Sequence, residues 1–291
     1  MAETRIRTDR KKGIALALLS AASFGMMSIF VAMTRGHISV MEQTFFRNLI
    51  GFFLIGFVCY REHIPFYGER KYAPQLFARC FFGFMGVMCL FYATRNAAIA
   101  DVTIVSRLDM FTITAVSAIF LHEKLGRWHY LAMAVAFTGA FIAANPRFDS
   151  GFLPLLGAFG TALCNTVSYP TMSYLAGRVN SLTIIMCFCT FSTLAAIPLM
   201  WSTFVLPTGW TLAGLLALGA FAASGQICLT YSYHYAPAGE LSIYSQLSIL
   251  INALLGLVFL GQVPSGRTIL GGALVMTASI GLCIYKQRRK A

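Results

Sequence analysis

The chain has 291 residues, of which 58% are hydrophobic and only 11% are charged, and its formal net charge is +12. Soluble domains carry about 25% charged residues, and a soluble core of this size could not bury so much apolar surface, so the composition excludes an ordinary soluble domain. The basic residues cluster before the first apolar segment and after the last, which indicates membrane topology and argues against a nucleic-acid partner.

Ten apolar segments are predicted to cross a lipid bilayer, which takes about 20 mainly apolar residues. Short polar or Gly/Pro-containing segments separate them, as at 35–37, 145–147 and 261–264. The first segment is too long for a removable signal peptide and lacks a small-residue cleavage site. In chain order the predicted spans are 13–34, 39–60, 75–94, 98–121, 128–144, 152–176, 180–203, 210–234, 238–260 and 267–285.

An even number of spans places both termini on one side of the membrane. We assign that side to the cytoplasm, because it then holds most of the Lys and Arg of the loops. This assignment counts Arg267 on the cytoplasmic side and leaves Arg35, Arg95 and Arg147 on the other side. The prediction is an all-α integral membrane protein with ten transmembrane helices and both termini in the cytoplasm.

The second half of the chain repeats the first half, and the residues from Tyr92 onward align without gaps with those from Tyr231 onward. In one register the aligned pairs include Tyr92 with Tyr231, Ser106 with Ser245, Leu108 with Leu247, and Thr138 with Thr277. The predicted repeats are 13–144 and 152–285, with five spans each, and an odd number of spans makes the second copy enter the membrane from the opposite side. Inverted repeats allow two similar packings, each open to one side, which is the basis of alternating access in secondary transporters.

Short motifs occur at matching places in the two halves. They are the segment 92–101, the run 119–125, Gly139, and the run 258–262 of the second copy. With these motifs the chain resembles the EamA-type branch of the drug/metabolite transporter superfamily over nearly its whole length. Family members commonly have a glutamate shortly after the leucine of these runs, Leu121 and Leu260 here, in both copies. Glu123 matches that pattern and Gln262 departs from it. A weaker similarity links the chain to the eukaryotic nucleotide-sugar branch.

Charged side chains within the fourth predicted span mark a candidate substrate site. A charge at the centre of a membrane helix costs about 2.5–3.5 kcal/mol by insertion scales, yet Arg107 and Asp109 lie near the middle of this span. The repeat places Gln246 and Ser248 at the same depth, and such transporters bind substrate near the midplane between their repeats. We expect Arg107 to hold an anionic group and Asp109 a cationic group or a proton. The alternative is a structural ion pair that locks helices together.

Other polar residues within the spans join this candidate site. Asn165 and Tyr169 are four residues apart and so share one helix face, and Pro170 is expected to kink that helix. The alternative for these residues is a hydrogen bond that joins two helices. The substrate-binding candidates are Arg107, Asp109, Asn165, Tyr169, Gln226, Tyr244, Gln246 and Ser248.

Three further residues are candidates for coupling or gating. Arg47 matches a position where many EamA-type members have an arginine, and a structural or gating role is favoured because an arginine near a helix end can reach water. Glu240 begins a predicted span, where an acid favours the helix dipole, and proton coupling is the alternative. His234 could titrate near neutral pH or simply end its helix before Pro237. Arg79, near the cytoplasmic start of the third span, is assigned to positive-inside anchoring.

Motifs of enzymes and ATP-driven pumps are missing from the sequence. His122-Glu123 begins a metalloprotease-like motif, but Gly126 stands where the second histidine would be. A nucleophile elbow and a phosphate-binding loop are also missing. We therefore expect a protein that is not an enzyme, with no cofactor and no bound metal.

The predicted function is secondary-active transport, with export favoured, of a small polar metabolite such as an amino acid or another amphoteric solute. The resemblance places it in a bacterial inner membrane. The alternatives are a carrier of organic anions or nucleotide-like metabolites, and an uncoupled facilitator or pore. The expected partners are a small-molecule substrate, the lipid bilayer, and a coupling proton or ion, and a homodimer is left open.

Overall fold

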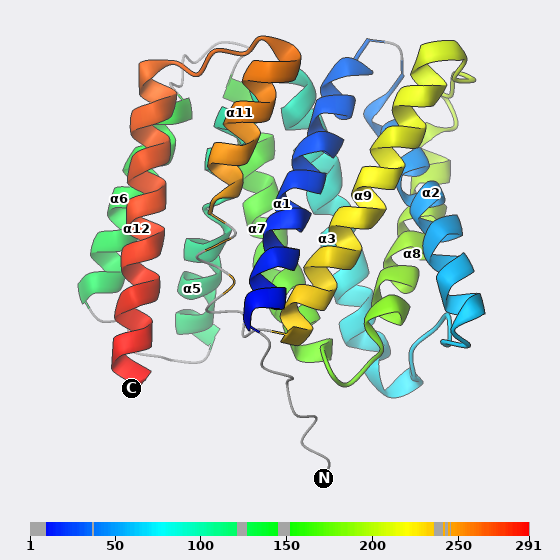
Figure 1. Cartoon of the computed structure of the whole chain (residues 1–291), viewed down its shortest axis with the longest axis horizontal. Coiled ribbons are helices and arrows are strands. Elements are labelled where there is room, and N and C mark those ends of the chain that lie inside the picture. The colour runs from blue at the N-terminus through cyan, green and yellow to red at the C-terminus, as the bar shows by residue number, and fades with distance from the viewer. Residues whose placement is uncertain are drawn as a thin grey trace.

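The computed structural model describes residues 10–36, 38–120, 127–144, 152–235, 241, 244 and 246–290. Regular structure in these residues is helical, apart from one isolated bridge between Ala176 and Val179. Figure 1 shows the helices side by side as a bundle. They are α1 (Arg10–Met33), α2 (Val40–Arg61), η1 (Arg70–Tyr72), α3 (Ala73–Asn96), α4 (Ile99–Ser106), α5 (Asp109–Phe120), α6 (Arg127–Ala144), α7 (Phe152–Leu175), α8 (Ser181–Met200), α9 (Gly209–Tyr235), α11 (Ser248–Leu260) and α12 (Gly266–Lys290).

The helices have the length and surface of a membrane protein. Six of the described helices, α1, α2, α3, α7, α8 and α9, are long and apolar enough to cross a membrane, and α11 and most of α12 are shorter apolar helices. Large apolar side chains cover the outside, among them Phe53, Phe57, Phe141 and Leu254, whereas Gln43, Thr44 and Asn48 are buried within the bundle. A surface more apolar than parts of the interior suits lipid as the surrounding solvent.

The beginning of α1 and the end of α12 lie at the same end of the bundle (Figure 1). This arrangement agrees with an even number of crossings. Because α12 begins at Gly266 and runs toward that end, Arg267 lies at the end away from the termini. The assignment of Arg267 to the side of the termini is therefore wrong, since the segment before α12 belongs to the opposite side.

The start of α2 shows how a local motif fixes a helix boundary. The Ser39 hydroxyl accepts a hydrogen bond from the backbone N–H of Glu42, and the Glu42 carboxylate accepts one from the backbone N–H of Ser39, which together form a capping box. The other Glu42 oxygen accepts from the backbone N–H of Val205, at 3.1 Å. Glu42 thus ties the α8–α9 connection to α2.

The closest helix pairs join one half of the chain to the other. They are α1 with α9, α3 with α7, α6 with α12, and α2 with α8. Where α6 crosses α12, a Cβ on Gly139 would lie 2.8 Å from the carbonyl oxygen of Gly271, so the two backbones touch directly. Small residues permit this kind of close crossing in membranes.

The predicted span 98–121 is not one continuous helix. Its first part, α4, ends at Ser106, and α5 begins at Asp109, with a turn at Arg107 and Leu108 between them. The backbone N–H of Leu108 donates to the carbonyl of Val105, 3.1 Å away and three residues back, and not four residues back as in an α-helix. The prediction of an uninterrupted helix is wrong here, because the chain turns at Arg107 and Leu108, immediately before Asp109.

The second half turns at the same place in the repeat. Gln246 and Leu247 form a turn before α11 begins at Ser248. The backbone N–H of Leu247 donates to the carbonyl of Tyr244 at 3.1 Å, which is the counterpart of the Leu108 bond in the aligned register. The predicted span 238–260 is therefore also interrupted, and both interruptions lie at the positions that the sequence marked as polar.

Candidate functional site

The two helix breaks face each other across the two halves. Nε of Arg107 donates a 2.7 Å hydrogen bond to Oγ of Ser248, the first residue of α11. Nε2 of Gln246 lies 3.9 Å from Sδ of Met110, in the first turn of α5. Each break thus reaches the helix that follows the other break, and the predicted residues Arg107, Gln246 and Ser248 come together.

Asp109 lies in the same group, with only 5% of its surface exposed. One carboxylate oxygen accepts a 3.2 Å hydrogen bond from Nδ2 of Asn165 on α7. Arg107 is close enough to attract Asp109 electrostatically. The hydrogen bonds found for the two side chains go to other partners. The choice between substrate binding and a locking ion pair stays a prediction.

The middle of α7 carries the next part of the site. Asn165 and Tyr169 lie one turn apart, as expected from their spacing, and Pro170 lies within the helix. Tyr169 is close enough to interact electrostatically with Asp109 and Arg107, and also with Arg79 and Arg47. It therefore lies among all four charged side chains.

Arg79 belongs to this region, although the sequence was interpreted differently. Its side chain is 4% exposed, its Nη1 donates to Oγ of Ser168 at 2.9 Å, and its guanidinium carbon lies 4.8 Å from the ring centroid of Phe188. The assignment to positive-inside anchoring is wrong, because the side chain points into the bundle. The only signal in the sequence was a charge flanked by the apolar run of the third span, which fits either location.

Arg47 is also inside the bundle, 5% exposed. Its Nη1 donates to Oδ1 of Asn48 at 2.7 Å, and its guanidinium carbon lies 5.5 Å from the centroid of the Phe188 ring. The argument that this arginine reaches water therefore fails, whereas its role in gating remains a prediction.

The other predicted residues are less connected to this group. Gln226 is buried on α9, and Tyr244 is partly buried one turn before the second break, but the described structure gives neither side chain a hydrogen bond to the group. The side chain of His234 and the whole of Glu240 lie outside the described residues. Oε1 of Gln246 is buried and has no hydrogen-bond partner among the described residues.

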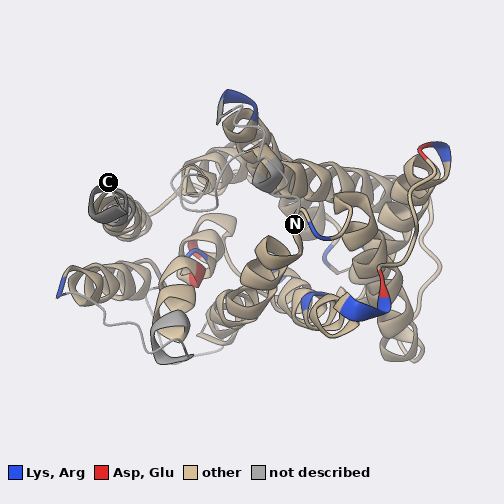
Figure 2. Cartoon of the chain, turned by 90° about the horizontal axis from the view of Figure 1, so that it is seen from below, with Lys and Arg blue, Asp and Glu red and all other residues tan. Residues whose placement is uncertain are grey.

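A few charged side chains lie inside the bundle. Figure 2, seen from the end where the termini lie, shows Lys and Arg both at the rim of the bundle and inside its outline. Among the described residues, the buried charged side chains are Glu42, Arg47, Arg79 and Asp109. The same part of the chain contains no group of three His, Cys, Asp or Glu side chains placed to hold a metal ion.

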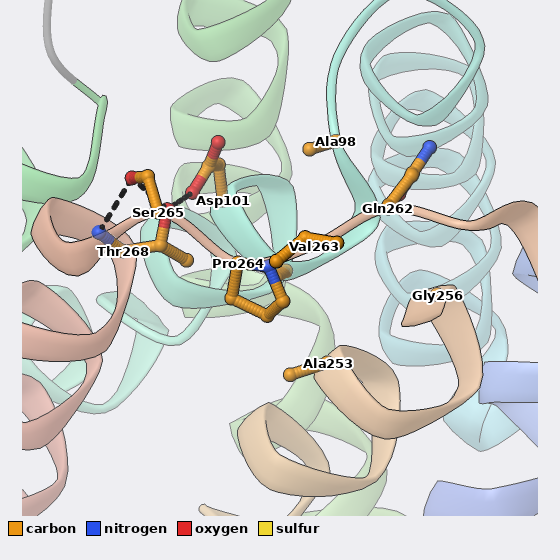
Figure 3. Close-up of a pocket in the computed structure, with 10 residues that line it drawn as sticks. Ala98, Asp101, Ala253, Gly256, Gln262, Val263, Pro264, Ser265 and Thr268 are labelled. Carbon is orange, nitrogen blue, oxygen red and sulfur yellow. Dashed lines mark hydrogen bonds between the residues drawn. The ribbon is translucent and has the colours of Figure 1, made fainter. Parts of the chain in front are cut away.

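A cavity of about 110 Å³ lies at the end of the bundle away from the termini, where the α11–α12 link passes the beginning of α4. Oε1 of Gln262 accepts the backbone N–H of Ile99 at 3.1 Å. Figure 3 shows the second contact, in which the Thr268 hydroxyl donates to Asp101 at 2.8 Å. These two bonds hold the link and the first turn of α12 against the first turn of α4.

Comparison with known proteins gives a consistent picture. The model of the EamA-like transporter family matches residues 11–145 and again 152–284. The pseudopaline exporter of Pseudomonas aeruginosa is 31% identical over 282 residues, which cover 95% of this chain and 98% of that protein. A riboflavin transporter of Rhizobium johnstonii is 32% identical over 183 residues, 62% of this chain and 60% of that protein. A crystal structure 17% identical to this chain shares its fold with a TM-score of 0.70, covering 98% of this chain and 100% of the other.

Proposed function

The chain belongs to the EamA-like transporter family, and on that premise we propose that it is a secondary-active carrier that exports a small amphoteric metabolite. It crosses the inner membrane ten times as two inverted five-helix repeats, 13–144 and 152–285, with both termini in the cytoplasm. The cargo binds between the two helix breaks, and the repeats rock about it to open the site to each side in turn.

The observation that carries this proposal is the matched pair of breaks. Interrupted membrane helices at corresponding places in two repeats are the strongest structural pointer to the binding site of a secondary transporter. Here the breaks coincide with Arg107 in one half and Gln246 in the other, and each contacts the opposite half. A protein that served only as a scaffold would need no polar group at this depth.

The pairing of the helices supports the inverted arrangement. In the repeat register α1 corresponds to α7 and α9 to α3, so the pair α1–α9 becomes the pair α7–α3 when the halves are exchanged. The pairs α2–α8 and α6–α12 each join a helix to its own counterpart. A pseudo-twofold axis between the halves produces this pattern.

The chemistry of the site favours a cargo with both signs of charge. Arg107 uses only Nε in its bond to Ser248, which leaves its two Nη groups to hold a carboxylate or another anionic group. Asp109 and Oε1 of Gln246 offer acceptors to an ammonium group. The direction of transport follows the pseudopaline exporter, whose similarity extends over nearly the whole chain.

The test is a thermal-shift screen of the purified protein in detergent against amino acids, nucleosides, nucleotides and organic acids, with Arg107→Ala and the exposed-loop variant Arg35→Ala as the matched control. A ligand at a hundredfold excess over its Kd stabilises the folded state by about 2.7 kcal/mol. We expect an amphoteric compound to shift the wild type and Arg35→Ala but not Arg107→Ala.

Transport is then measured with that compound in proteoliposomes. A carrier shows counterflow, in which unlabelled compound inside drives uptake of labelled compound. Flux without counterflow would identify a pore and overturn the proposal. A binding shift that survives in Arg107→Ala would place the cargo away from the two breaks.

A further inference from the structure

Two buried arginines converge on one aromatic ring next to the candidate substrate site. The guanidinium carbons of Arg47 on α2 and Arg79 on α3 lie 5.5 and 4.8 Å from the centroid of Phe188 on α8. Both distances are within the range of a cation–π contact. Three helices thus bring two positive charges to a single place inside the bundle.

Arg47 has bonding capacity that the described protein does not use. Its Nη1 donates to Asn48, but its Nε is buried and has no hydrogen-bond partner. The described groups that act on it electrostatically are Cys189, Arg79 and Tyr169. Cys and Tyr are neutral at physiological pH and Arg79 repels it, so an acidic neighbour is missing from this set. An unpaired donor on a buried cation is costly, and an anion supplied from outside the protein would satisfy it.

This cationic pair lies next to the group around Asp109. Asn165, which donates to Asp109, and Ser168, which accepts from Arg79, are three residues apart on α7, or about 4.5 Å along the helix axis. Tyr169 lies among the charges of both groups. One helix face therefore connects the two places.

Glycines on α3 allow side chains of both places to pack closely against its backbone. A Cβ on Gly83 would clash with Nη1 of Arg79 and lie 2.9 Å from the Phe188 ring. A Cβ on Gly86, one turn further along, would lie 3.7 Å from Oδ1 of Asn165. Gly83 thus faces the contact between Arg79 and Phe188, and Gly86 faces Asn165, so one side of α3 borders both places.

We propose that Arg47 and Arg79, on the Phe188 ring, form a second subsite that binds an oxyanion of the cargo, a carboxylate or a phosphate. The fork of an arginine holds such groups by paired hydrogen bonds. The cargo then spans two subsites, with its far anionic group at the arginine pair and its amphoteric end between Arg107 and Asp109. This inference rests on the proposed function and narrows its cargo to amphoteric molecules with an additional acidic group.

The experiment compares probes that differ in one charge. Unfolding midpoints of the full-length protein in detergent are measured with glutamate, glutamine, glutarate and inorganic phosphate at matched ionic strength. We expect glutamate to bind at least tenfold more tightly than glutamine. In Arg47→Met that preference disappears, whereas in Arg61→Met it is kept, because Arg61 is an exposed arginine on α2 whose guanidinium carbon lies 6.0 Å from the Phe57 ring centroid.

The remaining probes and variants distinguish a phosphate group from a carboxylate and test the role of the arginine pair. Tighter binding of phosphate than of glutarate identifies a cargo with a phosphate group, and tighter binding of glutarate identifies a cargo with a second carboxylate. In either case Arg47→Met must lose the binding of the preferred probe. Arg47→Lys, which keeps the charge and loses the fork, and Phe188→Leu, which removes the ring, serve if Arg47→Met does not fold. An unchanged preference in these variants overturns the subsite while leaving the carrier proposal intact, since counterflow is measured separately. Equal binding of glutamate and glutamine by the wild type also overturns it.

Discussion

Nε of Arg107 in the first half donates to Oγ of Ser248 in the second half, 2.7 Å away. In the repeat register Ser248 is the counterpart of Asp109. Arg107 therefore contacts, in the second half, the residue that is equivalent to Asp109 in its own half. The same guanidinium therefore joins the halves and remains available to a ligand. Any motion that separates the halves at the breaks must carry or break this bond.

The first prediction concerns Ser248→Ala. This change removes the acceptor of Nε, and a hydrogen bond to a charged group contributes about 1.5–3 kcal/mol. We expect a lower free energy of unfolding, measured by denaturant titration in detergent. Arg107→Ala is expected to lose ligand binding and stay folded. If Arg107→Ala instead fails to express as a monodisperse protein, its role is structural.

The second prediction concerns coupling. If Asp109 carries the transported proton, Asp109→Asn keeps the bond with Asn165 and removes the titrating group, so uptake in proteoliposomes should no longer respond to an imposed pH gradient. Glu240→Gln tests the other candidate in the same way, and Glu69→Gln, on the exposed loop before η1, is the matched control. Wild-type pH dependence in both candidate variants would exclude these two carboxyl groups.

The third prediction concerns the crossing of α6 and α12. A Cβ on Gly271 would collide with Gly139 and Ala143, so Gly271→Ala should destabilise the protein by about 1–3 kcal/mol, the usual cost of overpacking. Gly281 lies on the same helix and has open space around its missing Cβ. Gly281→Ala should therefore be neutral or slightly stabilising. Equal unfolding midpoints for the two variants would contradict the close crossing.

The fourth prediction concerns the α11–α12 link. Gln262→Leu removes the acceptor for the first backbone N–H of α4 and should cost about 1 kcal/mol, as for other helix caps. Gln262→Glu keeps an acceptor and adds a favourable charge at a helix N-terminus, so it should be tolerated. Hydrogen exchange at the first turn of α4 distinguishes the two, and faster exchange in both would show that an amide is specifically needed.

The sequence was sufficient to predict where the helices lie, but not where two of them are interrupted. Runs of apolar residues between short polar segments located the described α-helices, with α4 and α5 joined in one predicted span, because lipid imposes one length and one polarity on a crossing. The turn at Arg107 and Leu108 contains neither glycine nor proline, and so carries no local signal of a break. Only the tertiary contacts explain the turn, since Arg107 donates a hydrogen bond to Ser248 in the other half.

The locations of the charged residues were harder to predict than the helices. Hydropathy places Arg79 within one turn or two of a helix end, but it does not tell whether the side chain turns toward water or toward Phe188. The role of Glu42 is easier to predict, because the spacing Ser39-x-x-Glu42 is a known sequence signature of a helix start. That motif could have assigned its role directly.

The pairing of helices across the halves has a consequence for the order in which the protein is made. The ribosome synthesises α6 long before α12, so the face of α6 that contains Gly139 has no partner helix until α12 has been synthesised. The same holds for α1 until α9 arrives and for α3 until α7 arrives. Insertion must therefore come first, one hydrophobic helix at a time, with tertiary structure completed only after translation reaches the last span.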